Sequence, residues 1–381
     1  MPDSTNVVTV VGGGLGGLRV VERLRHRGYE GQIVLLGAEP HPPYDRPPLS
    51  KQVLRGEREH SWLRRDNDFN ALDVDVRVGN AALGLDVQAR VVHTAQGEQP
   101  YDVLVIATGA TPRRIPGISG LVLRTLDDAR QLRDALKPGS RLAIIGAGLI
   151  GCEVAASART MDVEVSLVDV LGGPMIRVLG PQVAHMIAEL HEQHGVALHM
   201  NAAVVGSSDS QLTLGDGTVV GADVVLEAIG AVPDTAWLSN SSLALADGVL
   251  CDDQGLAAPG VFAIGDVARW GGHRSEHWTN AGQQADFVAA HILGQALPSR
   301  DVPYWWSDQY DIKLQGFGTP GADDAVQLLH WGPKSRTVAL YSNNGALTGV
   351  VGFSAAAAIM KLRGDIAAGT DVNEILNRLA P

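Results

Sequence analysis

Cysteine is scarce in this sequence. Cys152 and Cys251 are the only two among 381 residues, and they stand 99 positions apart with no C-x-x-C pair. So few thiols are typical of a protein from a reducing compartment, and we expect a cytoplasmic location. The spacing argues against a redox-active dithiol, because neither thiol has a second cysteine where a catalytic pair would need one. We expect both cysteines to be small, buried apolar residues.

Long apolar runs and an excess of positive charge are also missing. No stretch approaches the roughly 18 uninterrupted apolar residues of a transmembrane helix, so we expect no membrane partner. The first apolar run, Val7–Val11, is too short for the core of a signal peptide, and we expect none. The chain carries 30 basic and 42 acidic residues, for a net charge of −12. This balance argues against nucleic acid as a partner, because phosphate backbones bind basic surfaces.

Glycine and apolar residues, in contrast, are abundant. The chain has 45 glycines, and 45% of its residues are hydrophobic. An apolar fraction of this size allows substantial cores, and so many glycines favour a fold with tight turns between strands and helices. The length predicts two or three domains.

The first forty residues carry a dinucleotide-binding pattern. The β-branched run Val7–Val11 predicts a buried parallel strand, and residues 15–27 predict a helix with one apolar face. A second strand over Ile33–Leu36 leads to Glu39, 22 residues after the last glycine of the motif. The motif itself is G-x-G-x-x-G, made by Gly12, Gly14 and Gly17. Strand, glycine turn, helix, strand and acid in this order predict a mononucleotide-binding unit.

Each part of this pattern has a chemical task. The glycines permit a tight turn and let backbone N–H groups approach a pyrophosphate. The helix N-terminus adds partial positive charge beside the phosphates. The acid accepts hydrogen bonds from a ribose.

The pattern occurs a second time. Arg141–Ile145 predicts a strand, residues 149–160 a helix, and Glu164–Val168 the next strand, which ends on Asp169, 18 residues after the last glycine. The glycines here are Gly146, Gly148 and Gly151. The segments Asp102–Pro112 and Asp223–Pro233 also match each other, at a constant offset of 121 residues. The second copy therefore lies inside the first, and the chain is expected to bind two dinucleotides and transfer electrons between them.

Other segments are less specific. Four prolines between His41 and Lys51 predict a stiff loop, suited to hold a cation beside a planar ligand or to act as a solvated connector. Residues 74–78, 90–94 and 102–106 predict strands, residues 127–136 a helix, residues 260–266 a strand ending in an acid, and residues 280–294 a helix. The last region predicts an α+β cap, with strands near 328–330, 338–341 and 348–353 and helices near 355–363 and 372–379.

Six segments together resemble a known family. They are Gly12–Gly17, Tyr44–Lys51, Ala107–Gly109, Gly146–Glu153, Ile264–Asp266 and Trp306–Gln309. They are similar to segments of the FAD-dependent, NADH-oxidising ferredoxin reductases, such as putidaredoxin reductase, rhodocoxin reductase and the reductases of biphenyl dioxygenase systems. The resemblance covers nearly the whole chain in the right order, and the loop at 44–51 with Trp306–Gln309 is its most specific part.

The resemblance implies the fold of glutathione reductase. This is an α/β fold with two Rossmann-like dinucleotide-binding domains, the NAD domain inserted in the FAD domain, and an α+β C-terminal domain. The expected boundaries are residues 1–110 and 234–301 for the FAD-binding domain, 111–233 for the NADH-binding domain and 302–381 for the C-terminal domain.

The resemblance also implies FAD as a bound cofactor. Its expected contacts are Gly12, Gly14, Leu15, Gly17, Glu39, Arg46, Lys51, Ala82, Ala107, Gly109, Arg130, Asp266 and Trp278. Glu39 would bind the adenosine ribose and Asp266 the ribityl chain. The expected catalytic residues are Arg46, Pro47 and Lys51, which would lie along the isoalloxazine, and Glu153. A cation at that ring favours its electron-rich reduced form.

NADH is the second expected cofactor, and no metal ligand is implied. Its expected contacts are Gly146, Gly148, Ile150, Gly151, Glu153, Asp169, Arg177 and Gly230. Glu153 would orient the nicotinamide carboxamide. Asp169 would accept the ribose 2′-hydroxyl and repel a 2′-phosphate, so NADH is expected over NADPH. The chain departs from the family in having Asp169 where glutamate is more usual, a less polar run at 171–174, and slightly fewer residues around 255–259.

The implied activity is hydride transfer from NADH to FAD, followed by two one-electron transfers to a [2Fe–2S] ferredoxin or a rubredoxin-like carrier. That carrier would serve a cytochrome P450 or a Rieske-type oxygenase, and the reductase would be a monomer or weak homodimer. No side chain need act as acid, base or nucleophile. Because ferredoxins are generally acidic, a local basic face is expected. Its candidates are Arg55, Arg58, Arg64, Arg65, Lys313, Lys334 and Arg336.

Other activities of the same fold stay open. An NADH oxidase or peroxidase would need a cysteine near positions 40–55, where the sequence has none. A monodehydroascorbate-type reductase is harder to exclude. A flavoprotein like apoptosis-inducing factor, which acts through partner binding rather than turnover, usually carries targeting sequences and basic patches that are absent here. A degenerate flavoprotein subunit is disfavoured by the two intact glycine motifs.

Overall fold

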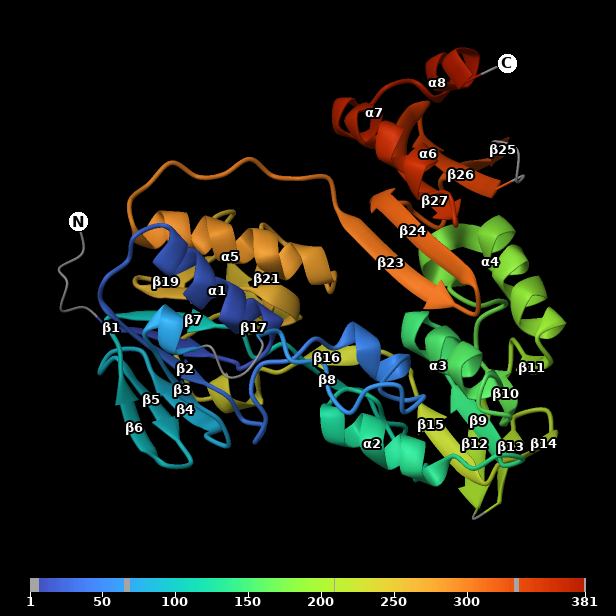
Figure 1. Ribbon diagram of the computed structural model, residues 1–381, viewed down its shortest axis with the longest axis horizontal. Helices are drawn as coiled ribbons and strands as arrows, with labels where there is room; N and C mark the ends of the chain where they lie inside the picture. Colours follow the sequence, from blue (N-terminus) through green and yellow to red (C-terminus); the bar gives the residue numbers. More distant parts are fainter. Residues whose placement is uncertain (1–6, 65–68, 209, 332–335, 380–381) are drawn as a thin grey trace. The chain divides into compact units, whose positions relative to one another are not determined.

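The computed structural model describes residues 7–64, 69–208, 210–331 and 336–379 (Figure 1). The chain forms two compact units. The first unit comprises residues 1–45, 60–111 and 231–301, and the second unit comprises residues 46–59, 112–230 and 302–381. Two short strands, β8 (Ala110–Pro112) and β16 (Ala231–Pro233), pair with each other.

The first unit is built on a six-stranded sheet in the order β19-β20-β7-β1-β2-β3. All neighbours are parallel except β19 and β20. The strands are β1 (Val7–Val11), β2 (Gln32–Leu36), β3 (Val74–Arg77), β7 (Val103–Ile106), β19 (Leu256–Ala258) and β20 (Val261–Ala263). Helices α1 (Leu15–His26) and α5 (Trp278–Ile292) lie against each other, side by side in Figure 1.

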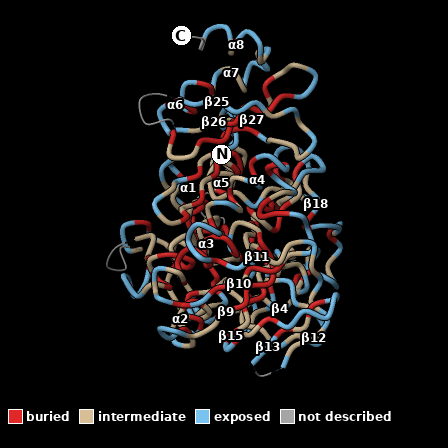
Figure 2. Tube along the Cα trace, turned by 90° about the vertical axis from the view of Figure 1, so that its right-hand side faces the viewer, coloured by how far each residue is buried: buried red, intermediate tan, exposed pale blue. Residues whose placement is uncertain are grey.

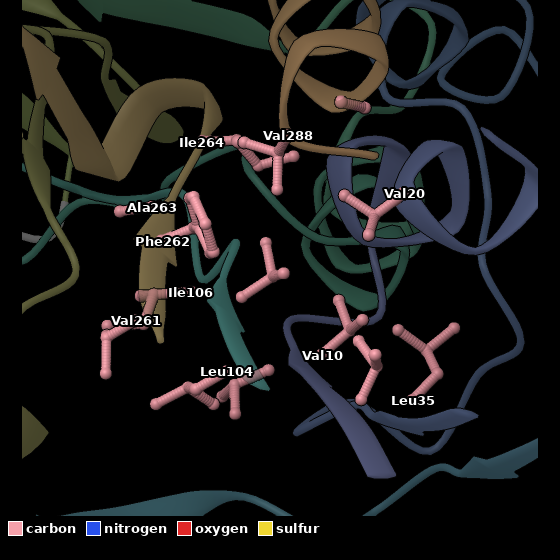
Figure 3. Close-up of a cluster of buried hydrophobic side chains, with 14 of the residues drawn as sticks. Val10, Val20, Leu35, Leu104, Ile106, Val261, Phe262, Ala263, Ile264 and Val288 are labelled. Carbon is pink, nitrogen blue, oxygen red and sulfur yellow. The ribbon is translucent and has the colours of Figure 1, made fainter. Parts of the chain in front are cut away.

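The core of the first unit lies where this sheet meets its helices. Figure 3 shows Val10, Leu35 and Ile106 of neighbouring strands close to Val20 of α1 and Val288 of α5. All five are fully buried or nearly so. A parallel sheet needs apolar residues on both faces when helices cover it, which is why these strands are almost uninterrupted runs of valine, leucine and isoleucine.

Smaller elements complete the first unit. A three-stranded antiparallel sheet contains β4 (Ala82–Asp86), β5 (Val91–Thr94) and β6 (Gly97–Pro100). A four-stranded sheet contains β17 (Leu245–Ala246), β18 (Gly248–Cys251), β21 (Ala268–Trp270) and β22 (His273–Arg274). Its described residues also form the 3₁₀ turns η3 (Asn70–Leu72), η4 (Ala236–Leu238) and η5 (Gly265–Val267).

The second unit repeats the plan on a four-stranded parallel sheet, β11-β10-β9-β15. Its strands are β9 (Arg141–Ile145), β10 (Glu164–Val168), β11 (Val196–His199) and β15 (Val224–Glu227), and its helices are α2 (Leu126–Ala135), α3 (Leu149–Arg159) and α4 (Ile176–Gln193). A small antiparallel sheet joins β12 (Val204–Ser208), β13 (Gln211–Leu214) and β14 (Val219–Gly221). The 3₁₀ turn η1 (Pro47–Ser50) belongs to this unit as well.

An antiparallel sheet, β23-β24-β27-β26-β25, ends the chain within the second unit. Its strands are β23 (Tyr304–Gln309), β24 (Ile312–Gly318), β25 (Ala325–Trp331), β26 (Arg336–Asn343) and β27 (Ala346–Phe353). Helices α6 (Ala356–Lys361), α7 (Arg363–Ala368) and α8 (Val372–Leu379) follow. One apolar core joins this sheet to the nucleotide-binding fold, with Trp305 and Tyr341 packed among residues of α3, α4 and β9. In Figure 2 the buried residues of this unit gather around β9 and β10, whereas the chain near α8 is exposed.

The expected α/β fold with an α+β end is confirmed. The strands expected at 141–145 and 164–168 have those bounds, and both helices after the glycine motifs end within a residue of expectation. Helix α4 and the β23–β24 hairpin were not expected. The three-domain division stays a prediction, since the compact units group residues 46–59 and 302–381 with 112–230. Among the described helices, none is both long and apolar enough to cross a membrane.

Candidate functional site

The first glycine turn has the geometry of a phosphate cradle. A Cβ on Gly12 would lie 2.1 Å from the carbonyl oxygen of Ala107, and one on Gly17 would lie 2.0 Å from the carbonyl oxygen of Gly12. Nothing lies within 4 Å of a Cβ built on Gly14, which caps α1 without a side-chain hydrogen bond. Packing therefore demands glycine at two positions, while the third faces open space at a helix N-terminus. This arrangement suits a pyrophosphate.

The second glycine turn repeats this geometry. A Cβ on Gly146 would lie 2.4 Å from the carbonyl oxygen of Ala228, and one on Gly151 would lie 2.0 Å from that of Gly146. Gly148 again faces open space and caps α3 without a side-chain hydrogen bond. The two turns thus present two separate helix N-termini, each with room for phosphate oxygens.

The two acids predicted to bind riboses are both held by their surroundings. Tyr44 donates a hydrogen bond to Glu39 Oε2 at 2.6 Å. Asp169 follows β10, where its Oδ2 accepts from the Ala147 amide at 2.7 Å and its Oδ1 from the Leu171 amide at 2.8 Å. A carboxylate oxygen accepts more than one hydrogen bond, so Asp169 keeps lone pairs for a ribose hydroxyl while its position is fixed.

The remaining predicted positions of the first unit lie on its strand ends and turns. Ala107 and Gly109 follow β7, and Gly109 has φ 76° and accepts a hydrogen bond from the Asp234 amide at 3.0 Å. Asp266 lies in η5, and Trp278 opens α5 and donates from Nε1 to Asp45 Oδ1 at 2.7 Å. Leu15 and Ala82 begin α1 and β4.

A buried ion pair lies in the second unit. Lys51 Nζ is 2.5 Å from Glu153 Oε2, and each side chain is 5% exposed. Lys51 also donates to the carbonyl oxygen of Pro47 at 3.0 Å. A charge removed from water is costly unless it is paired and its remaining hydrogen-bonding atoms are satisfied. Lys51, Pro47 and Glu153, three of the four predicted catalytic residues, therefore meet in one place.

Serine side chains donate further hydrogen bonds to the carboxylate of this ion pair. Ser50 donates to Glu153 Oε2 at 2.5 Å, and Ser307 donates to Glu153 Oε1 at 2.9 Å. Ser157, one helical turn beyond Glu153 on α3, donates to the carbonyl oxygen of Ser50 at 2.7 Å. The sequence analysis assigned no role to these serines. Strand periodicity could have indicated Ser307, because Trp305, Ser307 and Gln309 share the buried face of β23.

Local structure explains how these groups meet. Pro47 and Pro48 begin η1, which turns the chain so that Ser50 and Lys51 follow one another into the interior. Glu153 lies on the second turn of α3, and α3 packs against both η1 and β23. Three segments of the second unit, far apart in the sequence, thereby converge on one carboxylate.

Other predicted residues of the second unit make different contacts or are exposed. Arg46 donates to the carbonyl oxygen of Arg124. Arg130, on α2, is 3.2 Å from Asp127 Oδ1 and 3.3 Å from the Glu59 carbonyl oxygen. Arg177 is exposed on α4, Ile150 is 42% exposed on α3, and Gly230 has φ 97° before β16. Their cofactor contacts stay predictions.

The two cysteines are free. Cys152 is buried as expected, and its burial raises the pKa of its thiol far above the ordinary range. Cys251 is only partly buried, contrary to expectation, and burial raises the pKa of its thiol to about 12. Because a raised pKa keeps a thiol protonated near neutral pH, both cysteines are weak nucleophiles. No cluster of three or more histidine, cysteine or acidic residues suited to a metal ion occurs among the described residues.

The candidate basic residues are distributed over both units. Arg64, in the first unit, is 2.8 Å from Glu22. Arg55, in the second unit, is 2.6 Å from Glu57. The other described candidates, Arg58, Lys313 and Arg336, are exposed in the second unit. Arg65 and Lys334 lie outside the described residues, and a common docking face stays a prediction.

The chain matches two known protein families. Residues 6–285 match the family described as pyridine nucleotide-disulphide oxidoreductase, and residues 304–376 match the reductase C-terminal family. The ferredoxin reductase component of chlorobenzene dioxygenase from Cupriavidus sp. is 38% identical over 328 residues, covering 82% of this chain and 80% of that protein. The ferredoxin–NAD(+) reductase component of the biphenyl dioxygenase system from Paraburkholderia xenovorans is 38% identical over 330 residues, covering 82% and 81%.

A solved structure has the same fold. The crystal structure of the covalent putidaredoxin reductase–putidaredoxin complex matches with a TM-score of 0.91 at 30% sequence identity. The match covers 97% of this chain and 95% of that chain.

Proposed function

This chain belongs to the pyridine nucleotide-disulphide oxidoreductase family, and we propose that it passes electrons from NADH through FAD to a ferredoxin. The observation that carries the proposal is the pair of glycine turns. Each places an open second glycine, Gly14 or Gly148, at an uncapped helix N-terminus. Two such turns fit two dinucleotides, and electron transfer between them needs no dithiol in this chain, whose described cysteines are both free.

The first turn is the FAD site in this proposal. The amides at the start of α1 hold the pyrophosphate, and Glu39 accepts hydrogen bonds from the adenosine ribose. Asp266 binds the ribityl chain, and Trp278, tied to Asp45, presents its backbone to the pyrimidine end. FAD, once bound, supplies the redox chemistry by accepting a hydride and releasing its electrons one at a time.

The second turn is the NADH site. The amides at the start of α3 hold the pyrophosphate, and Asp169 accepts the ribose 2′-hydroxyl. The negative charge of Asp169 repels a 2′-phosphate, so NADH is preferred over NADPH. Its two backbone hydrogen bonds fix that charge in place.

The Lys51–Glu153 pair supplies orientation and charge. Glu153 accepts a hydrogen bond from the nicotinamide carboxamide and thereby aligns the hydride donor. Lys51 places a positive charge where the flavin ring becomes electron-rich. Because the pair is buried, its field is screened less than it would be at a surface. No side chain acts as acid, base or nucleophile in this proposal.

The acceptor is a [2Fe–2S] ferredoxin that serves a cytochrome P450 or a Rieske-type oxygenase. The relatives named above are reductase components of dioxygenase systems, which supports this class of partner. A rubredoxin-like carrier remains the alternative acceptor. Docking of an acidic carrier uses exposed basic side chains such as Arg58, Lys313 and Arg336, and the reductase works as a monomer or weak homodimer.

Anaerobic stopped-flow spectroscopy tests the proposal. The purified yellow protein is mixed with NADH or with NADPH, and then with an oxidised [2Fe–2S] ferredoxin or with ferricyanide. Fast bleaching by NADH alone, followed by fast reoxidation by the ferredoxin, is the expected result. A long-lived reduced complex that no one-electron acceptor discharges would favour a flavoprotein that acts through partner binding. A colourless protein that FAD cannot reconstitute would overturn both functions.

A further inference from the structure

The hydrogen bonds around Glu153 continue beyond Ser307. Gln309, fully buried on β23, donates from Nε2 to Ser307 Oγ at 3.2 Å. Within the described chain, the amide oxygen of Gln309 has no hydrogen-bond partner, and neither has Nε2 of His191. Buried polar atoms without partners are rare because burial strips them of water. An unpartnered amide oxygen and an unpartnered imidazole nitrogen in one region can satisfy each other by pairing.

Gln309 and His191 lie in one region, because Tyr310, the residue after Gln309, has its hydroxyl 2.8 Å from His191 Nδ1. Burial lowers the pKa of His191 to about 4, and the Gln309 side chain acts in the opposite direction. A hydrogen bond from the Nε2–H of His191 to the Gln309 amide oxygen would satisfy both of the unpartnered atoms.

The other ring nitrogen of His191, Nδ1, contacts a residue that is only partly buried. His191 Nδ1 lies 2.8 Å from the hydroxyl of Tyr310. The ring of Tyr310 stacks on His194, with 3.6 Å between centroids, and His194 is exposed. Burial raises the pKa of Tyr310, and of the titratable groups on α3 Cys152 also raises it, whereas Arg159 lowers it. The connected side chains thus run from the buried Glu153 to the surface of α4.

Tyr310 occupies an unusual backbone position. It has φ 55° in the two-residue turn between β23 and β24, where Gln309 pairs with Ile312. Such turns favour asparagine, aspartate or glycine, because a bulky side chain is disfavoured at positive φ. The contacts of Tyr310 with His191 and His194 offset that preference and fix the hydroxyl.

The direction of every hydrogen bond follows from Glu153. An ionised carboxylate only accepts, so Ser307 must donate to it, and Ser307 must then accept from the Gln309 amide nitrogen. The Gln309 oxygen is left as an acceptor and requires a donor, which the Nε2–H of His191 supplies. A neutral imidazole has one N–H, so Nδ1 accepts from Tyr310.

We propose that Tyr310, His191, Gln309 and Ser307 form one hydrogen-bond chain whose donors all point toward Glu153 and which positions that carboxylate for the nicotinamide. The role in positioning rests on the proposed function, whereas the direction of the chain does not. Tyr310, His191 and Gln309 are positioning residues, because they act on Glu153 only through Ser307. Successive donors polarise one another, so the chain holds the negative charge more firmly than Ser307 alone.

Nitrogen-15 NMR of histidine-labelled, flavin-loaded protein tests the direction of the chain. His191 is expected to be the Nε2–H tautomer between pH 6 and 8, roughly the range in which a neutral imidazole persists when its pKa is low. Gln309→Leu is expected to switch it toward Nδ1–H, which then donates to Tyr310. Tyr310→Phe should leave Nε2–H in place, as should the control Tyr341→Phe, whose hydroxyl donates to the Leu179 carbonyl oxygen in the same unit. An Nδ1–H tautomer in the wild type overturns the proposal.

Stopped-flow reduction by NADH tests the positioning. Ser307→Ala is expected to slow hydride transfer by roughly ten- to hundredfold, because a misplaced orienting group costs about that much. Ser307→Thr, which keeps the hydroxyl, should recover most of the rate, and Tyr341→Phe should match the wild type. Equal rates for Ser307→Ala and the wild type overturn the positioning role. A wild type that NADH does not reduce overturns the proposed function instead, while the tautomer measurement still decides the direction of the chain.

Discussion

Lys51 Nζ and Glu153 Oε2 are 2.5 Å apart in the interior of the second unit, although 102 residues separate them in the sequence. Each side chain is almost completely shielded from water, and Ser50 and Ser307 supply further donors to the carboxylate. A pair buried in this way depends on both partners, because either charge alone would remain desolvated.

Lys51→Met is therefore expected to destabilise the protein by about 3–5 kcal/mol, the usual cost of leaving one partner of a buried ion pair alone. The double variant Lys51→Met/Glu153→Leu should recover most of that loss, because no uncompensated charge remains. Urea unfolding of the single and double variants gives the coupling between the sites. Lys313→Met, at an exposed lysine, is the matched control. Additive losses in the double variant would contradict the expectation.

The glycines of the first turn should respond differently to alanine. Gly14→Ala adds a methyl group in open space at φ −91°, so the fold should survive while FAD binding weakens. Gly17→Ala drives its Cβ against the Gly12 carbonyl oxygen, so this variant should be strongly destabilised. Thermal unfolding and the flavin content of the purified variants separate the two effects. Full FAD affinity in Gly14→Ala would mean that the open face does not hold the pyrophosphate.

Asp169→Asn should weaken the preference for NADH over NADPH. Removing the charge costs a hydrogen bond to a charged group, about 1.5–3 kcal/mol, and also removes the repulsion of a 2′-phosphate. The ratio of kcat/KM for the two nucleotides should therefore fall by roughly ten- to hundredfold, because about 1.4 kcal/mol corresponds to a factor of ten. Asp216→Asn, in the exposed turn before β14, is the control. An unchanged ratio would remove Asp169 from the ribose site.

Stability should depend on pH through His191. Its pKa is lowered to about 4 in the folded chain because the ring is buried, compared with 6.5 as its ordinary value. As pH falls from 6.5 toward 4, the unfolded state binds a proton that the folded state does not, so stability decreases. The slope for one proton is about 1.4 kcal/mol per pH unit.

Urea unfolding of the wild type and of His191→Gln across this pH range isolates the effect. The pH-dependent part should be smaller in the variant, and above pH 6.5, the ordinary pKa of the ring, the difference between the two should become constant. His185→Gln, at an exposed position on the same helix, should keep the slope of the wild type. Parallel curves for His191→Gln and the wild type would show that His191 does not titrate on unfolding.

The local patterns of the chain were predictable from the sequence. A G-x-G-x-x-G motif between an apolar strand and an amphipathic helix determines its own turn, because backbone contacts such as that of Gly17 with the Gly12 carbonyl oxygen exclude every larger residue. The motifs also located Asp169 directly after β10 and Glu39 three residues after β2, since parallel strands and tight turns fix the spacing. The resemblance, in turn, correctly indicated the fold and the family.

Only the tertiary structure decided which groups meet at Glu153. Ser307, Gln309 and His191 belong to a strand and a helix that were not expected, since β23 has mixed polarity and α4 contains Gly180 and Pro181. Alternation along β23 could have indicated that Ser307 and Gln309 are buried, but not that they lie near Glu153. Their positions depend on how β23 and α4 pack against α3 within one apolar core. Contacts within a turn are set by neighbouring residues, whereas contacts across more than a hundred residues are set by packing, which no local pattern records.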